Sequence, residues 1–168
     1  MELRIEAGWA LWGARRMRCA LGRAGVRANK REGDGGTPAG VWRMRYLLCR
    51  PDRFPRPPPT GLPFRLLRPG DGWCDDPADP LYNRAVTLPY PGHAEALWRA
   101  DAIYDLIVPL GYNDGEGAPI VPGAGSAIFI HIARPQFTPT DGCVALARDD
   151  LLTVLAEAST ASIVRILV

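Results

Sequence analysis

Lysine is almost absent from the 168-residue chain, in which Lys30 is the only one, and histidine occurs only as His93 and His131. The 20 basic residues face 18 acidic ones, and the resulting net charge of +2 excludes a nucleic-acid-binding protein that depends on bulk positive charge. No segment approaches the roughly 20 consecutive apolar residues of a transmembrane helix. We therefore expect no nucleic-acid partner and no membrane span.

The four cysteines, Cys19, Cys49, Cys74 and Cys143, form no CxxC pair and no zinc-binding pattern. We expect no metal and no organic cofactor. Cys49 and Cys74 are candidates for a disulfide in an oxidising compartment, although their spacing does not establish proximity. Residues 1–10 lack the basic and apolar segments of a secretory signal. Either the protein works without a secretory signal, or the segment that directs its export is not part of this sequence.

The sequence contains 18 glycines and 17 prolines, which interrupt helices and form turns, and this content favours a loop-rich β fold over a helix bundle. In residues 15–21, Met17, Cys19 and Leu21 share one face and arginines occupy the other, so Cys19 is expected to be a buried small hydrophobe. Further strands are expected within residues 1–8, 41–48, 103–110, 126–133, 144–146 and 160–168.

Two helices are expected besides these strands. One spans residues 93–100 with Leu97 and Trp98 inward. The other has Asp149 or Asp150 in its first turn and an apolar stripe formed by Leu151, Leu152, Val154 and Leu155. Residues 50–92 have little periodicity and predict a long proline- and glycine-rich insertion, which its aromatic residues indicate to be ordered. The chain is therefore predicted to be one mainly-β domain over residues 1–168, sandwich-like or barrel-like, with a few short helices.

His131 and Cys143 are the strongest candidates for chemistry, since one loop joins the segments that carry them. Alternation places His131 at the end of an apolar strand, on the face of Ala127 and Phe129. Such a pair suits nucleophilic acyl transfer, because an imidazole can take the thiol proton and hold the thiol pKa low. The amides around Gly142 and Cys143 are expected to stabilise an oxyanion.

Simpler interpretations of the same two residues stay open at this stage. A cysteine beside apolar residues is commonly a buried hydrophobe, and a histidine in an apolar strand is commonly a hydrogen-bonded core residue. The spacing alone does not identify a reaction.

At these residues the sequence resembles the L,D-transpeptidase catalytic domain of the YkuD type. That family carries a strand histidine and then a Ser/Thr-x-Gly-Cys-hydrophobic motif, matched here by His131 and residues 140–144. Its earlier Thr-Pro-x-Gly turn is matched by residues 37–40. The resemblance spans most of the chain, and residues 104–129 are similar to one branch of the family.

The resemblance implies a β-sandwich-like domain whose Cys143 forms a thioester with a peptidoglycan stem peptide, with His131 as general base. A backbone carbonyl is expected to orient the other imidazole nitrogen. The thioester then passes to the diaminopimelate amine of an acceptor stem, or to water. The resemblance also implies a role in the cell wall and cell shape, and inhibition by carbapenems.

The sequence departs from the family pattern in three places. The path from His131 to Cys143 is short, Asp141 stands where many members have histidine, and Ala145 stands where many have arginine or asparagine. The resemblance is therefore to a compact-motif branch, in which the cross-link joins either two diaminopimelates or L-alanine to diaminopimelate.

Other residues are weaker candidates for substrate binding. Arg134 is expected to grip a stem carboxylate, unless it is an ordinary surface arginine. Tyr82 and Asn83 belong to the insertion and are expected either to wall the site or simply to pack. The remaining candidates are Thr140, Asp141 and His93.

Three functions from these residues remain in competition. The first is a cysteine L,D-transpeptidase, the second is a thiol L,D-carboxypeptidase or amide hydrolase acting on the same stems, and the third is a non-catalytic cell-wall binding module. The expected partners are donor and acceptor stem peptides. A monomer in the periplasm or cell envelope is expected from the substrate, with the cytoplasm as the alternative location.

Overall fold

Short strands make up most of the regular backbone in the computed structural model, which describes residues 1–168. Ten of them form one large sheet, in the order β6-β15-β1-β2-β3-β14-β13-β12-β7-β8. Their bounds are Gly40–Arg43 (β6), Ile163–Ile166 (β15), Glu2–Glu6 (β1), Trp9–Trp12 (β2), Arg15–Ala20 (β3), Val144–Leu146 (β14), Phe129–Ile132 (β13), Leu106–Pro109 (β12), Leu47–Cys49 (β7) and Phe64–Leu66 (β8). The mainly-β prediction is confirmed.

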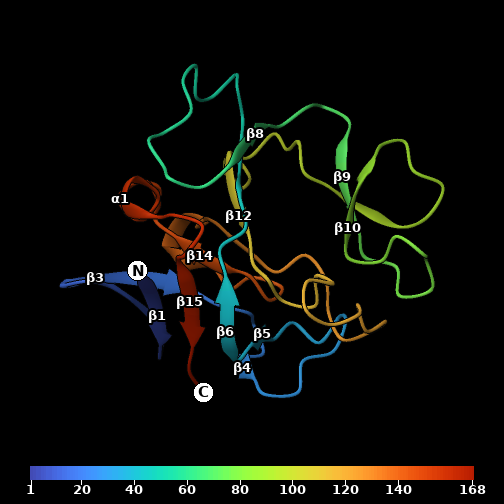
Figure 1. Ribbon diagram of the computed structural model, residues 1–168, viewed down its shortest axis with the longest axis horizontal. Coiled ribbons are helices and arrows are strands. Elements are labelled where there is room, and N and C mark those ends of the chain that lie inside the picture. The colour runs from blue at the N-terminus through green and yellow to red at the C-terminus, as the bar shows by residue number, and fades with distance from the viewer.

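The two ends of the chain are adjacent strands of this sheet. β15 pairs in parallel with β1, and β1, β2 and β3 follow one another as an antiparallel meander (Figure 1). The predicted facing of β3 is confirmed, because Met17 and Cys19 are buried and Arg16 and Arg18 are exposed. Alternation in the sequence thus orients this strand correctly.

The hydrophobic core divides into two clusters. The larger one holds 25 buried residues, drawn from β1, β2 and β3, from one face of β12–β14, and from helix α1 (Arg148–Glu157). Helix α1 buries Leu151, Val154 and Leu155 and carries Asp149 and Asp150 in its first turn, as predicted. The smaller cluster of nine residues includes Trp73, Phe129 and Cys143.

β13 separates the two clusters by its alternation. Ile128, Ile130 and Ile132 point into the larger cluster, whereas Phe129 belongs to the smaller one and His131 stacks against Tyr104 of that cluster. The predicted facing of this strand is confirmed. The face of the large sheet that carries His131 is therefore the face of the smaller cluster.

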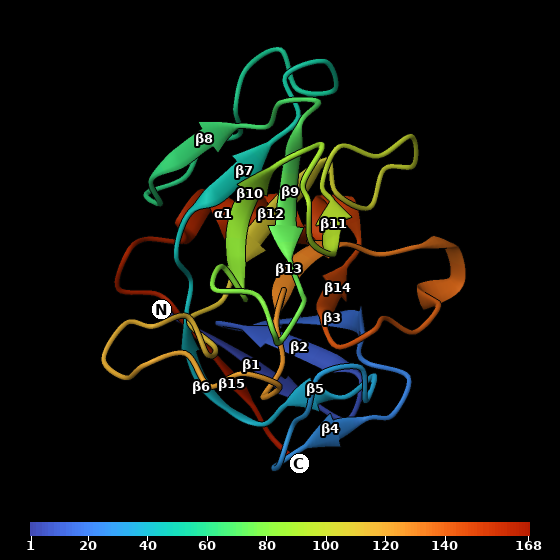
Figure 2. The ribbon, with the colours of Figure 1, turned by 90° about the vertical axis from the view of Figure 1, so that its right-hand side faces the viewer.

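A small three-stranded sheet covers that face. It comprises β9 (Asp71–Cys74), β10 (Arg84–Thr87) and β11 (Ala94–Ala96), with β9 in the middle, and lies in front of β12–β14 (Figure 2). Trp73 of β9 meets Phe129 of β13 edge to face, with ring centroids 5.1 Å apart. The insertion expected at residues 50–92 thus supplies two of these strands and β8.

The helix expected at residues 93–100 is wrong, because this segment contains β11 instead. The free edge of β9 accepts its backbone, with Ala94 opposite Cys74 and Glu95 opposite Trp73. A helix of eight residues gains little stability on its own, so tertiary pairing overrides the sequence pattern. Leu97 is fully buried, as predicted.

The remaining elements are short. β4 (Val26–Arg27) and β5 (Thr37–Pro38) form a two-stranded pair, and residues Pro135–Phe137 form a 3-10 helix. None of the helices has the length and apolar character that crossing a bilayer requires.

Candidate active site

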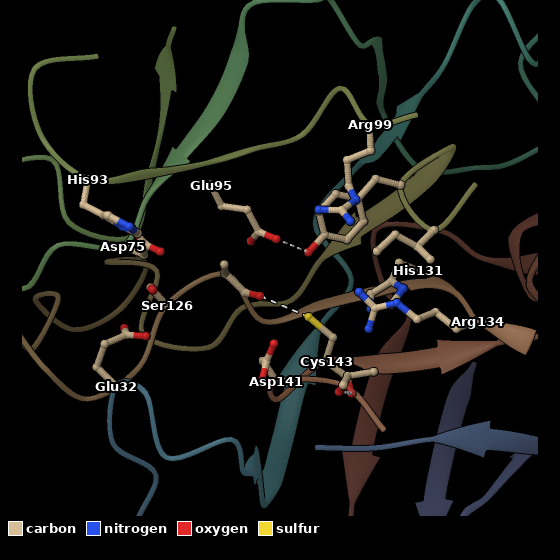
Figure 3. A pocket seen from close by; sticks show the side chains of 14 residues that line it. Glu32, Asp75, His93, Glu95, Arg99, Ser126, His131, Arg134, Asp141 and Cys143 are labelled. Atoms are coloured by element: carbon tan, nitrogen blue, oxygen red, sulfur yellow. Dashed lines mark hydrogen bonds and ion pairs between the residues drawn. The ribbon is translucent and has the colours of Figure 1, made fainter. Parts of the chain in front are cut away.

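A cavity of about 440 Å³ opens between the small sheet and the end of β13. Cys143 and His131 both line it (Figure 3). The close-up shows Glu32, Asp75 and His93 towards one end of the cavity and Arg99, Arg134 and His131 towards the other, with Glu95 and Cys143 between them. The other lining residues are Ile103, Tyr104, Ser126, Ala127, Thr140 and Asp141.

Strand pairing brings Cys143 and His131 together. β13 and β14 run in parallel, with Ile130 opposite Val144 and His131 opposite Ala145. Cys143 immediately precedes β14, so it shares a face with Ala145 and is the diagonal neighbour of His131. The loop between the two strands therefore delivers both side chains to one cavity.

His131 is held as a neutral base. It is 4 % exposed, and its Nδ1 lies 2.9 Å from the carbonyl oxygen of Ile132. Because a carbonyl only accepts, Nδ1 carries the proton and Nε2 keeps a free lone pair. Burial, offset in part by this hydrogen bond, lowers the pKa of His131 to about 4. At neutral pH the imidazole is thus uncharged and able to take a proton.

Cys143 is held as a neutral thiol. It is 7 % exposed, its Sγ donates to the carbonyl oxygen of Ala127 at 3.2 Å, and the Phe129 N–H donates to Sγ at 3.4 Å. Burial raises the pKa of Cys143 to about 12, so the expectation that the imidazole holds this pKa low is wrong. Desolvation outweighs the imidazole because His131 is itself uncharged. The resting pair is thiol and imidazole rather than thiolate and imidazolium.

Thr140 braces the turn before the cysteine. Its Oγ1 donates to the carbonyl oxygen of Cys143 at 2.7 Å and accepts from the Gly142 N–H at 3.2 Å. The Gly142 amide is therefore already engaged, whereas the Cys143 N–H makes none of the chain's hydrogen bonds. Of the two amides expected to stabilise an oxyanion, the Cys143 N–H is the one that is free to do so.

Gly142→Ala is expected to lower the free energy of unfolding by about 2–3 kcal/mol, because its φ of +140° disfavours any side chain. A Cβ there would also lie 2.8 Å from the carbonyl oxygen of Gly36. Thermal unfolding measures the loss. The control is Gly117→Ala, whose φ is +87° and whose surroundings are open. Equal losses in the two variants would contradict a steric requirement at Gly142.

Three of the predicted substrate-binding residues line the cavity and are exposed. Arg134 makes no ion pair or hydrogen bond through its side chain. Asp141 has 86 % of its side chain exposed and pairs with Arg23. His93 has 77 % of its side chain exposed and pairs with Asp75, which raises the pKa of the imidazole.

Tyr82 and Asn83 are buried behind the site and do not line the cavity. The Tyr82 hydroxyl donates to Glu32 and accepts from the Gly125 N–H at 2.9 Å. The Asn83 Oδ1 accepts from the Ala127 N–H at 3.0 Å, and Ala127 has a left-handed φ of 52°. Both residues thus shape the loop whose Ala127 carbonyl receives the Cys143 thiol.

Sequence analysis missed several cavity residues, namely Glu32, Glu95, Arg99, Tyr104 and Ser126. Glu95 and Arg99 fall in the segment that was expected to be helical, so the direction of their side chains was not predicted. Tyr104 was predicted to lie in an apolar strand and in the segment similar to one branch of the family, but no role was assigned to it. Its aromatic ring with a polar hydroxyl, close to the start of that strand, was the one available signal.

The other three cysteines take no part in this site. All four cysteines are free thiols, so Cys49 and Cys74 are not bonded to each other. Cys19 is a buried member of the larger core cluster, as predicted. The chain brings together no group of three or more histidine, cysteine or acidic side chains that could hold a metal ion.

Comparison with known proteins gives one match. The family model described as the L,D-transpeptidase catalytic domain, YkuD, matches residues 6–166, nearly the whole chain. The chain belongs to the YkuD family. The comparisons with curated proteins and with solved structures found no match.

Membership of the YkuD family confirms the resemblance noted in the sequence. It associates this domain with L,D-transpeptidases and with peptidoglycan. The match includes both His131 and Cys143, along with the loop that joins their strands.

Proposed function

We propose that this YkuD-family protein is a cysteine L,D-transpeptidase that cross-links peptidoglycan stem peptides. One observation carries the proposal: a buried thiol and a neutral imidazole, on neighbouring parallel strands, open into the same cavity. The family match supplies the substrate class. In this proposal Cys143 is the nucleophile and His131 is the general base.

The first half of the reaction acylates the cysteine. Nε2 of His131 takes the thiol proton as Sγ of Cys143 attacks a donor carbonyl, so a full thiolate need not accumulate. The Cys143 N–H stabilises the resulting oxyanion. The carbon–nitrogen bond then breaks, the leaving amine takes the proton from His131, and a thioester remains.

The second half resolves the thioester. The side-chain amine of an acceptor stem attacks the thioester carbonyl, His131 takes the proton that the amine loses, and the sulfur leaves as the restored thiol. The product is a cross-link, either between two diaminopimelates or between L-alanine and diaminopimelate. Attack by water instead trims the donor.

Arg134 is the proposed contact for a donor carboxylate, because its guanidinium is exposed at the cavity and has no partner in the chain. Since peptidoglycan lies outside the cytoplasmic membrane, the proposal assigns the protein's work to the periplasm or cell envelope. Carbapenems are expected to acylate Cys143.

Mass spectrometry of purified tripeptide and tetrapeptide muropeptides tests the proposal. We expect incubation with the protein to produce dimers lighter than two monomers by the amino acid or peptide that the donor releases, and fragmentation to locate the new bond. Shortened monomers without dimers would replace the transpeptidase with a hydrolase. No change in any muropeptide would contradict both and favour a binding module.

A further inference from the structure

Glu95 is a carboxylate of the catalytic cavity to which the reaction above assigns no role. It lies on β11 opposite Trp73, and its side chain is partly buried. The Tyr104 hydroxyl donates to its Oε1 at 2.7 Å. Pairing of β11 with β9 therefore aims Glu95 towards Cys143 and His131 (Figure 3).

No cation of the chain forms an ion pair with Glu95. Arg99, four residues on, instead holds Asp101 through two hydrogen bonds of 2.9 and 2.7 Å. Two other acidic residues of the cavity have cationic partners, since Asp75 pairs with His93 and Asp141 pairs with Arg23, whereas Glu32 has none. A partly buried carboxylate without an ion-pair partner is costly, and burial raises the pKa of Glu95 against the Tyr104 hydrogen bond and the more distant charges of Arg99 and Arg134, which lower it. The cavity thus contains a negative charge that a cationic ligand would neutralise.

Tyr104 connects Glu95 to the reacting pair. Its ring meets the His131 ring edge to face, with centroids 5.3 Å apart, and meets Phe129 in the same way at 6.2 Å. The Phe129 N–H in turn donates to Sγ of Cys143. Glu95 is therefore separated from the general base by one aromatic side chain.

The charged side chains of the cavity are unevenly distributed. Arg99 and Arg134 lie towards the end of the cavity next to His131, Glu32 and Asp75 lie towards the other end, and Glu95 lies between them with Cys143 (Figure 3). Glu95 is thus placed to attract an ammonium to the reacting pair, whereas the end with the two arginines is suited to carboxylates.

We propose that Glu95 binds the ammonium group of the acceptor and so favours cross-linking over hydrolysis. The inference rests on the proposed transpeptidase function and names the residue that selects the acceptor. The acceptor enters as an ammonium, which has no lone pair for attack. One proton passes from it to the Glu95 carboxylate, which releases it to solvent later. The neutral amine then attacks the thioester, and its second proton passes to Nε2 of His131.

The experiment compares Glu95→Gln with wild type in the muropeptide reaction. Glutamine keeps an oxygen that accepts from Tyr104 but removes the charge. The ratio of dimer to trimmed monomer is measured over a series of acceptor concentrations, and acyl-enzyme formation is measured separately by intact-protein mass. Glu32→Gln is the matched control, since Glu32 also lines the cavity, accepts from a tyrosine and lacks an ion pair.

At a fixed acceptor concentration we expect Glu95→Gln to lower the dimer ratio at least about tenfold, and to lower it more than the acylation rate. Glu32→Gln is expected to change the ratio less than threefold. Glu95→Asp, which retains the charge, is expected to keep a higher ratio of dimer to trimmed monomer than Glu95→Gln. If Glu95→Gln does not fold, Glu95→Asp replaces it in the comparison with wild type.

Any of three results would overturn the inference. The first is a dimer ratio of Glu95→Gln within threefold of wild type. The second is an equal fall of the dimer ratio in Glu95→Gln and Glu32→Gln, and the third is a fall of the acylation rate of Glu95→Gln as large as the fall of its dimer ratio. Failure of the proposed function looks different, because the wild type itself would then form no dimers, whether it trims monomers through an acyl-enzyme or forms no acyl-enzyme from a stem peptide.

Discussion

Cys143→Ala is expected to lower the rate of dimer formation by at least about 10³-fold, because it removes the only nucleophile in the cavity that is placed beside a base. Neither the free Cys143 N–H nor substrate binding can replace the thioester. Dimer formation and acyl-enzyme formation, both followed by mass spectrometry, measure the loss. The same substitution should also prevent acylation by a carbapenem.

The fold of this variant is expected to survive. The alanine leaves the Phe129 N–H without its sulfur acceptor and removes the donor to the Ala127 carbonyl. Two weak hydrogen bonds of this kind contribute about 1–2 kcal/mol together, which corresponds to a fall in Tm of a few degrees. Thermal unfolding and circular dichroism check that the loss of turnover is chemical.

Cys19→Ala is the matched control for the loss of a thiol. Cys19 is as buried as Cys143, at 5 % exposure, but it lies in the larger core cluster and does not line the cavity. We expect this variant to lose stability and to retain the rate. Turnover by Cys143→Ala near the wild-type level would exclude cysteine catalysis altogether.

His131→Gln is expected to lower dimer formation by about 10²- to 10⁴-fold, the usual effect of losing a general base. The loss should be large because the pKa of Cys143 is raised to about 12, and only a minute fraction of the thiol ionises without help near neutral pH. Raising the pH should therefore rescue the variant, whose rate is expected to climb about tenfold per pH unit. Equal rates in the variant and the wild type at neutral pH would rule out base catalysis by this histidine.

The acid limb of the wild-type pH profile tests the same residue. A base must be unprotonated, and the pKa of His131 is lowered to about 4. The rate is thus expected to hold down to about pH 5 and to fall as the pH passes through 4. A fall centred near 6.5, the ordinary histidine pKa, would show that the imidazole is less buried than the structure has it.

Stability should report this titration independently. The unfolded chain binds a proton at His131 below about pH 6.5 and the folded chain only below about 4, so stability falls as the pH drops through this window. The whole shift corresponds to about 3 kcal/mol. His131→Gln is expected to flatten this dependence. His93→Gln is the control, since the pKa of that exposed histidine is raised and its removal leaves the slope between pH 4 and 6.5 in place.

Much of the fold follows from residue patterns that act locally. The alternation of apolar and polar residues correctly predicted that Cys19 of β3 faces inward, and the alternation along β13 correctly placed His131 on the face of Phe129. The acidic first turn and apolar stripe located α1. These predictions succeed because a two-residue or 3.6-residue period depends only on which face of an element is buried.

The pairing of Cys143 with His131 could also be predicted from the sequence. A histidine closing one strand and a cysteine opening the next are brought together by any tight parallel pairing of the two. The motif at residues 140–144 resembles that of the YkuD family, to which the chain belongs. The protonation state of the two residues could not be predicted from the sequence. Burial, rather than residue type, raises the pKa of Cys143 and lowers the pKa of His131.

Only the tertiary structure determined the surroundings of that pair. Residues 94–96 pair with the free edge of β9 as a strand, and this pairing directs the Glu95 side chain into the cavity. Tyr82 and Asn83 are buried and accept hydrogen bonds from the loop that carries Gly125 and Ala127, and the Gly142 N–H donates to the Thr140 hydroxyl. The sequence by itself determined which residues are candidates for the reaction, because their types and the periods around them are local properties. Charge, solvation and the choice of acceptor depend on segments far apart in the chain, and only folding brings those together.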